Sequence, residues 1–325
     1  MMDVQILLAL QNFREAVGGC LTDFLAFITT VAVDYYIMLP GLILFWAFSK
    51  RAGMIGLGSY GTACFGVSAL KSTFCVYRPW IRSELIHPLP EVMSGATGYS
   101  FPSGHSASVS GMYGGLIGVY RRHKGLCVLL GAVIALTMFS RLYVGVHTPQ
   151  DVLVGLLVGG AGTALVLLAD RFVTRHPGLD WVIVLIAAAM CAALLPYMYF
   201  KSYPMDYVNG VLLVDPTKMT VGGFKDPGRF FGVVLGWFIE RRFIRFDTDG
   251  TPYQNALRCL VGALLFIGYW TVVVEPLGKA INVGIAHFFL QASAPLLFMT
   301  VYPLVFQCAE KHAKQGSSSR VAPRA

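Results

Sequence analysis

The stretch S-R-L-Y-V-G-V-H-T-P-Q-D at residues 140–151 decides the interpretation of this sequence, because it places Arg, His and Asp between two apolar runs. Ionisable groups at the edge of apolar helices are costly unless they serve a purpose. Two earlier stretches occupy equivalent junctions, K-S-T-F-C-V-Y-R-P at 71–79 and F-P-S-G-H-S at 101–106. We therefore expect the three stretches to meet in one site.

The composition indicates a membrane protein. Of the 325 residues, 56% are hydrophobic and only 13% are charged, and the mean hydropathy is +0.64. Soluble domains carry about 25% charged residues, and the apolar runs here match the roughly 17–25 residues that cross a bilayer as a helix. The expected fold is all-α, a polytopic bundle of transmembrane helices.

Four parts are expected along the chain. Residues 1–31 mix apolar clusters with charges and are typical of an amphipathic interfacial helix, with a transmembrane span as the alternative. Residues 32–200 hold the three stretches and form a six-helix core, residues 201–309 add further helices after a polar loop, and residues 310–325 are expected to be disordered. Nine spans are predicted, at 35–49, 56–76, 104–120, 125–139, 150–168, 181–199, 230–244, 256–274 and 282–307.

The charge distribution and the cysteines limit the possible partners and the cellular location of the protein. The net charge is +8, but the basic residues cluster in short loops, which is the pattern of membrane topology and not the basic face that nucleic acid requires. The bias puts the three stretches on the outer side, and we expect the plasma membrane. The cysteines lie in apolar segments without a CxxC pair, so neither disulfides nor metal ligands are predicted, and the N-terminus lacks the features of a cleavable signal peptide.

Three glycine pairs fit the small-xxx-small pattern of closely packed membrane helices. They are Gly111/Gly115, Gly114/Gly118 and Gly155/Gly159. Glycine is common in membrane helices, so the pattern alone predicts close approach without identifying the partner helix.

The first stretch offers two cations. Lys71 and Arg78 are seven residues apart, so they share one face if the helix continues through both, and Pro79 would end that helix. Snorkelling of both side chains to the interface is the simpler alternative.

The second stretch is typical of a helix start. Ser103 is a natural N-cap, which places Gly104 and His105 in a first turn whose backbone N–H groups point outward. Helix N-termini of this kind bind phosphate oxygens, and His105 is suited to protonate a leaving group. The alternative is a capped helix with an interfacial His.

The third stretch contains a second helix start, with Thr148 as N-cap and Pro149 at the first helical position. A carboxylate at Asp151 stabilises the helix dipole in any case, but that role does not explain His147 or Arg141. A His oriented by a carboxylate has one ring nitrogen made nucleophilic. Arg141 supplies the bidentate fork that phosphate prefers.

Taken together, K-x6-R-P, P-S-G-H and S-R-x5-H-x3-D resemble the three motifs of the type-2 phosphatidic acid phosphatase superfamily. The matching residues are Lys71, Arg78, Pro79, Pro102, Ser103, Gly104, His105, Ser140, Arg141, His147 and Asp151. The resemblance implies a metal-independent phosphatase without a cofactor, related in fold to vanadium haloperoxidases and glucose-6-phosphatase.

The resemblance also implies roles. His147 attacks phosphorus to give a phosphohistidine, Asp151 orients it, and His105 protonates the departing alkoxide and then activates water. The phosphate oxygens are held by Lys71, Arg78, Ser103, the Gly104 amide and Arg141.

An outward site beside lipid suits an amphiphilic substrate, a lipid phosphate monoester or an isoprenoid diphosphate, with undecaprenyl diphosphate as the alternative. A transporter or a silent lipid-binding protein is the competing class, although binding alone would not require the two histidines. Asp34, Arg82 and Glu275 are candidates for shaping substrate access.

Overall fold

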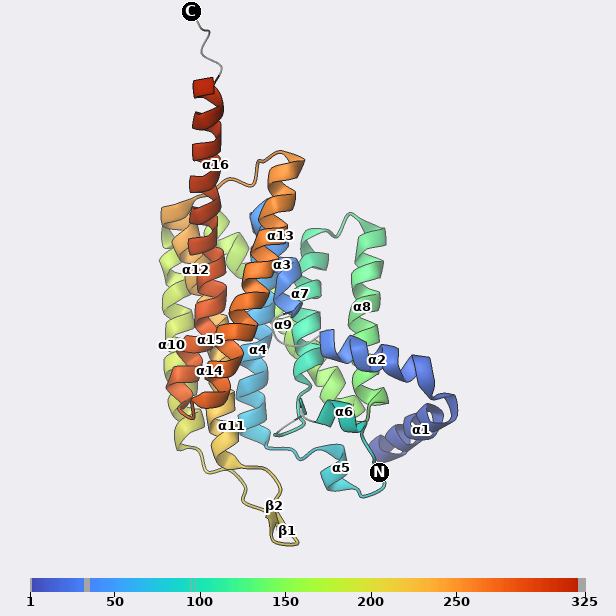
Figure 1. Ribbon diagram of the computed structural model, residues 1–325. Helices are drawn as coiled ribbons and strands as arrows, with labels where there is room; N and C mark the ends of the chain where they lie inside the picture. Colours follow the sequence, from blue (N-terminus) through green and yellow to red (C-terminus); the bar gives the residue numbers. More distant parts are fainter. Residues whose placement is uncertain (1, 32–35, 94, 97, 321–325) are drawn as a thin grey trace, which may run out of the picture.

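The computed structural model describes residues 2–31, 36–93, 95–96 and 98–320, and these are almost entirely helical (Figure 1). Two short strands, β1 (Tyr207–Val208) and β2 (Val211–Leu212), form a hairpin. The all-α fold is thereby confirmed. The helices up to the polar loop are α1 (Met2–Val17), α2 (Gly19–Val31), α3 (Leu39–Ala47), α4 (Lys50–Phe74), α5 (Pro79–Arg82), α6 (Pro90–Met93), α7 (Gly104–Val119), α8 (Lys124–Tyr143), α9 (Pro149–Arg175) and α10 (Asp180–Phe200).

The later part of the chain forms a second group of helices beside the first (Figure 1). They are α11 (Pro216–Gly223), α12 (Lys225–Ile239), α13 (Pro252–Tyr269), α14 (Glu275–Ala280), α15 (Gly284–Met299) and α16 (Val301–Arg320). Two π-helical turns, Glu240–Ile244 and Trp270–Val274, continue α12 and α13.

Five helical segments of the described chain are long and apolar enough to cross a membrane, which confirms a polytopic membrane protein. They are Lys124–Tyr143, Pro149–Arg175, Pro177–Phe200, Pro252–Ala280 and Gly284–Lys311. Helices α4, α7 and α12 run alongside these segments in Figure 1 but are shorter or less apolar. Many of their residues are buried against other helices, and each of the three carries several glycines.

The predicted span at 35–49 is wrong. Its described part is a short 3₁₀ turn followed by α3, whose nine residues rise only about 14 Å. The segment is apolar because it is buried inside the protein: Leu42, Phe45 and Trp46 are fully buried. The Trp46 Nε1–H group donates to the Phe298 carbonyl at 2.8 Å, which fixes α3 against α15.

Helices α4, α7 and α9 approach one another so closely that glycine is required between them. A Cβ atom at Gly111 of α7 would lie 2.7 Å from the Ser59 carbonyl oxygen of α4. A Cβ at Gly155 or Gly159 of α9 would lie 2.6 Å from the Ser103 oxygen or 2.7 Å from the Ala107 oxygen of α7. The close packing predicted from the glycine pattern is confirmed, and its partners are now identified.

A buried polar network joins α12 to the core. Asp226 accepts a hydrogen bond from Ser68 of α4 at 3.0 Å and one from Arg229 at 3.2 Å. Arg229, itself buried, also donates to Gln291 of α15 at 2.8 Å. Buried charges are tolerated when they are paired in this way, and Ser68 is one helical turn before Lys71.

Helices α1 and α2 lie across the direction of the bundle (Figure 1). Arg14 of α1 donates to the His87 carbonyl at 2.6 Å and to the Tyr143 carbonyl at 3.1 Å. The Gln11 side chain accepts from the His87 N–H at 2.8 Å. These contacts attach α1 both to α8 and to the loop that precedes the second charged stretch.

Helix α16 continues to Arg320, so residues 310–320 of the tail expected to be disordered are helical. At the point where the tail was predicted to begin, Glu310 accepts two hydrogen bonds from the buried Arg258, each 2.8 Å. A bidentate carboxylate–guanidinium pair is a strong local restraint. Residues 321–325 lie outside the described part of the chain.

Substitution of Gly159 by Ala tests the close packing of α9 on α7. We expect a loss of about 1–3 kcal/mol of stability, the usual cost of overpacking, because the nearest obstacles to the new methyl group include backbone atoms of α7. Gly160→Ala is the matched control, because a methyl group added there would have no atom within 4 Å. The measurement is the thermal unfolding midpoint in detergent, and equal midpoints for the two variants would contradict the packing.

Candidate active site

The three charged stretches meet at one end of the bundle, where α4 ends and α7 and α9 begin (Figure 1). The backbone N–H of Ser103 donates to the Asp151 carbonyl at 2.8 Å, which joins the second stretch to the third. Lys71 donates from Nζ to the Tyr99 carbonyl at 2.7 Å, two residues before the second stretch, and Arg78 of the first stretch lies 3.0 Å from His147 of the third. The predicted meeting of the three stretches is confirmed.

Both predicted helix starts are confirmed. The Ser103 side chain accepts from the Ser106 N–H at the start of α7. At the start of α9, Thr148 accepts from the Asp151 N–H while Asp151 accepts from the Thr148 N–H at 2.8 Å, a complete capping box with Pro149 in the first turn. The free N–H groups of α7 and α9 are therefore presented at the same end of the bundle.

The condition under which Lys71 and Arg78 would share one helix face is not met. Helix α4 ends at Phe74, because Cys75 adopts a left-handed conformation with φ of 50°. Pro79 does not end a helix but opens α5, with Arg78 as its N-cap. The turn at Cys75 nevertheless returns Arg78 to the site, where its guanidinium contacts His147.

The hydrogen bonds of His147 identify its tautomer. Arg78 Nη1 lies 3.0 Å from His147 Nε2, and a guanidinium has only donors, so Nε2 must be the unprotonated nitrogen. The proton is then on Nδ1, which lies 3.4 Å from Asp151 Oδ2 and 3.4 Å from Ser100 Oγ. His147 thus has a lone pair on Nε2 and a carboxylate behind the opposite nitrogen.

Ser100 is a site residue that the sequence analysis missed. Its hydroxyl donates to Asp151 Oδ2 at 2.6 Å, and both side chains are buried. Together with the Thr148 N–H, Ser100 fixes the carboxylate that contacts His147. Ser100 comes directly before the F-P-S-G-H-S stretch, and its position there is the signal that was available.

Thr29 is a second missed residue, and it comes from α2. Its hydroxyl lies 2.8 Å from the Ser140 hydroxyl and accepts from Arg141 Nη1 at 3.4 Å. All three residues are buried. No local pattern marks Thr29, because its contacts are with residues more than a hundred positions later.

Two buried nitrogen atoms in the described part of the site have no hydrogen-bond partner, Arg141 Nε and His105 Nε2. The electrostatic neighbours of His105 are Arg141, His147, Arg78 and Lys71, which places His105 among the basic residues of the site. Buried polar groups are normally paired, so both nitrogens are available to a ligand.

The site carries an excess of positive charge, with the three basic residues Lys71, Arg78 and Arg141 against two carboxylates, Asp151 and, near Lys71, Asp226. Burial lowers the pKa of Arg78 to about 10, with Asp151 opposing the shift, so Arg78 remains protonated at neutral pH. Burial, reinforced by Arg78, Arg141 and Lys71, holds the pKa of His147 well below its ordinary value. His147 is therefore neutral where an ordinary His would already be protonated.

The three residues proposed for substrate access lie outside this centre or cannot be described. Arg82 pairs with Asp3 of α1 at 3.2 Å, and Glu275 pairs with Lys279 on an exposed helix face. Asp34 lies outside the described residues. Over the residues that the structure describes, no group of three or more His, Cys, Asp or Glu side chains is arranged to hold a metal ion.

Comparison with known families agrees with this geometry. Residues 52–175 match the family model of the PAP2 superfamily, and residues 224–314 match the model described as PAP2 superfamily phosphatase, transmembrane extension. The chain belongs to the PAP2 superfamily. The resemblance found in the sequence is confirmed, and this PAP2 protein is an integral membrane phosphatase.

Two individual proteins resemble this PAP2 chain. One is an undecaprenyl-diphosphatase of Sulfolobus acidocaldarius, 28% identical over 154 residues that make up 47% of this chain and 71% of the relative. The other is the crystal structure of Aquifex aeolicus LpxE, 25% identical, with a TM-score of 0.45 over 51% of this chain and 95% of that one.

The lowered pKa of His147 predicts the acidic limb of the pH profile of phosphatase activity. Activity should be lost as pH falls through the pKa of His147, hence at a pH below the ordinary value of about 6.5. In Arg78→Gln one positive neighbour is removed, so the imidazolium is less disfavoured and the limb should move to higher pH. The measurement is kcat/KM against pH, which reports the free enzyme.

The same substrate is used for both proteins, so that ionisation of the substrate phosphate affects both profiles equally. The rate of Arg78→Gln should also fall, and only the position of the limb tests the electrostatic argument. An unmoved limb would show that Arg78 does not govern the protonation of His147.

Proposed function

We propose that this chain hydrolyses a lipid phosphate monoester or an isoprenoid diphosphate through a phosphohistidine at His147. The observation that carries the proposal is the Nε2 lone pair of His147, held 3.0 Å from Arg78 with Asp151 behind Nδ1. A cationic site that only binds phosphate would not need a nucleophile oriented in this way.

In the first step, the phosphate oxygens lie among Lys71, Arg78 and Arg141, together with Ser103 and the Gly104 amide at the start of α7. Nε2 of His147 attacks phosphorus as the bond from phosphorus to the leaving oxygen breaks. His105 donates its proton to that oxygen. The positive charge that develops on the His147 ring is stabilised by the Asp151 carboxylate, whose Oδ2 lies 3.4 Å from Nδ1.

In the second step, the neutral His105 takes a proton from water. The hydroxide formed attacks phosphorus, the bond between phosphorus and Nε2 breaks, and inorganic phosphate leaves. The electron pair returns to His147, and His105 is again protonated. Most of the stabilisation in both steps comes from fixed cations and amides around the phosphoryl oxygens.

The substrate class follows from the setting. A site at the end of a transmembrane bundle suits a substrate whose hydrocarbon tail stays in the bilayer while its phosphate enters the cationic centre. The Sulfolobus relative is an undecaprenyl-diphosphatase, which supports testing isoprenoid diphosphates beside lipid monoesters.

Purified protein in detergent tests the reaction and its independence of metal. We expect phosphate release from at least one lipid phosphate or isoprenoid diphosphate, unchanged by excess EDTA. His147→Ala should reduce the rate on the order of 10³-fold or more, as removal of a nucleophile does. Loss of activity in EDTA would refute metal independence, activity retained in the variant would refute the nucleophile, and no release from any substrate would favour a lipid-binding or transport protein.

Phosphoenzyme trapping separates the two histidines. His105→Asn should be slowed about 10²–10⁴-fold on alkyl phosphates, but an aryl phosphate with a good leaving group needs no proton. With that substrate the variant should release one equivalent of phenolate in a burst and accumulate a phosphoenzyme that is labile to acid and stable to alkali. His147→Ala should show neither the burst nor the adduct, and a burst without trapped phosphate would contradict the phosphohistidine.

We further infer that the site faces outward, from the bias of Lys and Arg toward the loops at the opposite end of the bundle. Cys20 and Cys308 are exposed and are replaced by Ser for this test. Met205→Cys, beside the catalytic end, should react with an impermeant maleimide in sealed right-side-out vesicles, whereas Asp249→Cys should react only after lysis. The reverse pattern would place the site in the cytoplasm.

A further inference from the structure

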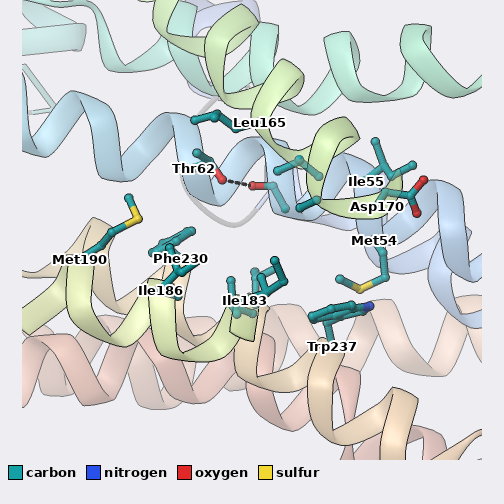
Figure 2. A pocket seen from close by; sticks show the side chains of 16 residues that line it. Met54, Ile55, Thr62, Leu165, Asp170, Ile183, Ile186, Met190, Phe230 and Trp237 are labelled. Atoms are coloured by element: carbon teal, nitrogen blue, oxygen red, sulfur yellow. Dashed lines mark hydrogen bonds between the residues drawn. The ribbon is translucent and has the colours of Figure 1, made fainter. Parts of the chain in front are cut away.

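An apolar cavity of about 290 Å³ lies between the core and the later helices. Figure 2 shows Ile55 of α4, Leu165 of α9, Ile186 of α10 and Trp237 of α12 around it. Asp170 lies at one end of this lining. The cavity thus touches both regions that match the family models, 52–175 and 224–314.

The apolar cavity is separate from the phosphatase site. Thr62, a lining residue, is nine positions before Lys71, roughly 13 Å along α4. Phe65 of α4 and Phe230 of α12 pack with ring centroids 5.1 Å apart and belong to a cluster with Leu194 and Met198. The cluster shares Phe230 with the lining of the cavity and continues through Leu194 and Met198 toward the catalytic end of α10, so packed side chains lie between the cavity and the proposed phosphate-binding residues.

A second cavity, of about 590 Å³, lies at the end of the bundle opposite the phosphatase site, and it is strongly basic. Its lining includes Arg51, Tyr120, Arg121, Arg122, His123 and Arg171. The cluster combines the start of α4, the turn between α7 and α8, and the end of α9.

One ion pair connects the two cavities. Arg51 lines the basic cavity, Asp170 lines the apolar one, and Arg51 Nη2 lies 2.7 Å from Asp170 Oδ2. Asp170 neutralises the charge of Arg51. The other three arginines that line the basic cavity, Arg121, Arg122 and Arg171, still attract an anion. A basic pocket between helices suits the negatively charged headgroup of an anionic lipid. The adjacent apolar cavity suits its hydrocarbon chain.

We propose that the two cavities form one binding site for an anionic phospholipid. A hydrocarbon chain occupies the apolar cavity, and the phosphate headgroup lies against Arg121, Arg122 and Arg171. A free anion would leave the apolar cavity unused, and a neutral lipid would leave the arginines unused.

Such a lipid would contact α4 and α9 of the core and α12 of the extension at once. A ligand that binds only the folded protein raises its thermal midpoint. The bound lipid therefore holds the extension against the core from the leaflet opposite the catalytic site.

The test uses full-length protein in nanodiscs of phosphatidylcholine, with or without phosphatidylglycerol, whose phosphodiester is not a phosphatase monoester substrate. Native mass spectrometry measures retained lipid, and thermal unfolding measures the midpoint. We expect phosphatidylglycerol to be retained and to raise the midpoint. Arg121→Gln/Arg122→Gln should bind it roughly thirty-fold more weakly, since each basic residue near anionic lipid contributes about 1 kcal/mol.

Lys201→Gln/Lys218→Gln is the matched control, because it removes the same charge near the catalytic end and should bind lipid as the wild type does. Lys218 is exposed, and Lys201 is half-buried with Nζ donating to the Thr73 carbonyl at 3.0 Å. Ala169→Phe places a ring in the apolar cavity and should also reduce retention. Arg121 and Arg122 are both exposed, so they can be replaced without disturbing packing. The Arg121→Gln/Arg122→Gln variant therefore decides the outcome even where Ala169→Phe fails to fold.

Three results would overturn the proposal. Equal retention of phosphatidylcholine and phosphatidylglycerol would mean that the arginines do not select the lipid. A midpoint raised as much by inorganic phosphate alone, and insensitive to Ala169→Phe, would indicate a site for free anions. Equal weakening in the lysine control would indicate general charge attraction. None of these readouts measures catalysis, so each can be repeated in His147→Ala.

Discussion

The close approach of α9 to α7 is the constraint on which the catalytic end depends. Gly155 and Gly159 let the backbone of α9 lie against carbonyl oxygens of α7. The same approach allows the Ser103 N–H to reach the Asp151 carbonyl. One helix start carries His105 and the other follows His147, so the distance between the helix axes sets the separation of the proposed proton donor from the proposed nucleophile. The geometry of the candidate site therefore depends on two glycines of α9, which have no side chain to hold the two helices apart.

Around that contact, the buried charged side chains Asp151 and Arg78 each have hydrogen-bond partners. Asp151 is held by Ser100 and by the Thr148 N–H, which leaves it aligned with His147. Arg78 rests on the lone pair of His147, so in this state a cation covers the nitrogen that would attack phosphorus. An incoming phosphate anion offers the guanidinium a stronger acceptor and would uncover the nucleophile as it binds.

Local patterns predicted the local structure of the site well. Ser103, Thr148 and Pro149 took their expected places because capping depends on residues within one turn. Whether one helix continues through Lys71 and Arg78 was left open by the sequence. A single left-handed residue, Cys75, ends the helix, and a cysteine is not one of the residue types, glycine or asparagine, that mark such a turn. Thr29 could not be identified because its hydrogen bond to Ser140 spans 111 positions. Ser100 was missed although it lies directly before the second stretch, because its partner Asp151 is 51 positions away. Apolar α3 was mistaken for a span because burial in protein and burial in lipid favour the same residues.

The contact of Thr29 with Ser140 and Arg141 changes what counts as the catalytic unit. The region that matches the PAP2 family begins at residue 52, yet Thr29 of α2 contacts Ser140 and Arg141 of the candidate site. Helix α1 is attached to the same end of α8 through Arg14. A fragment cut at the family boundary would expose Ser140 and the Arg141 guanidinium to lipid or water. The structural unit that completes the candidate site therefore begins before residue 52, where the match to the family begins.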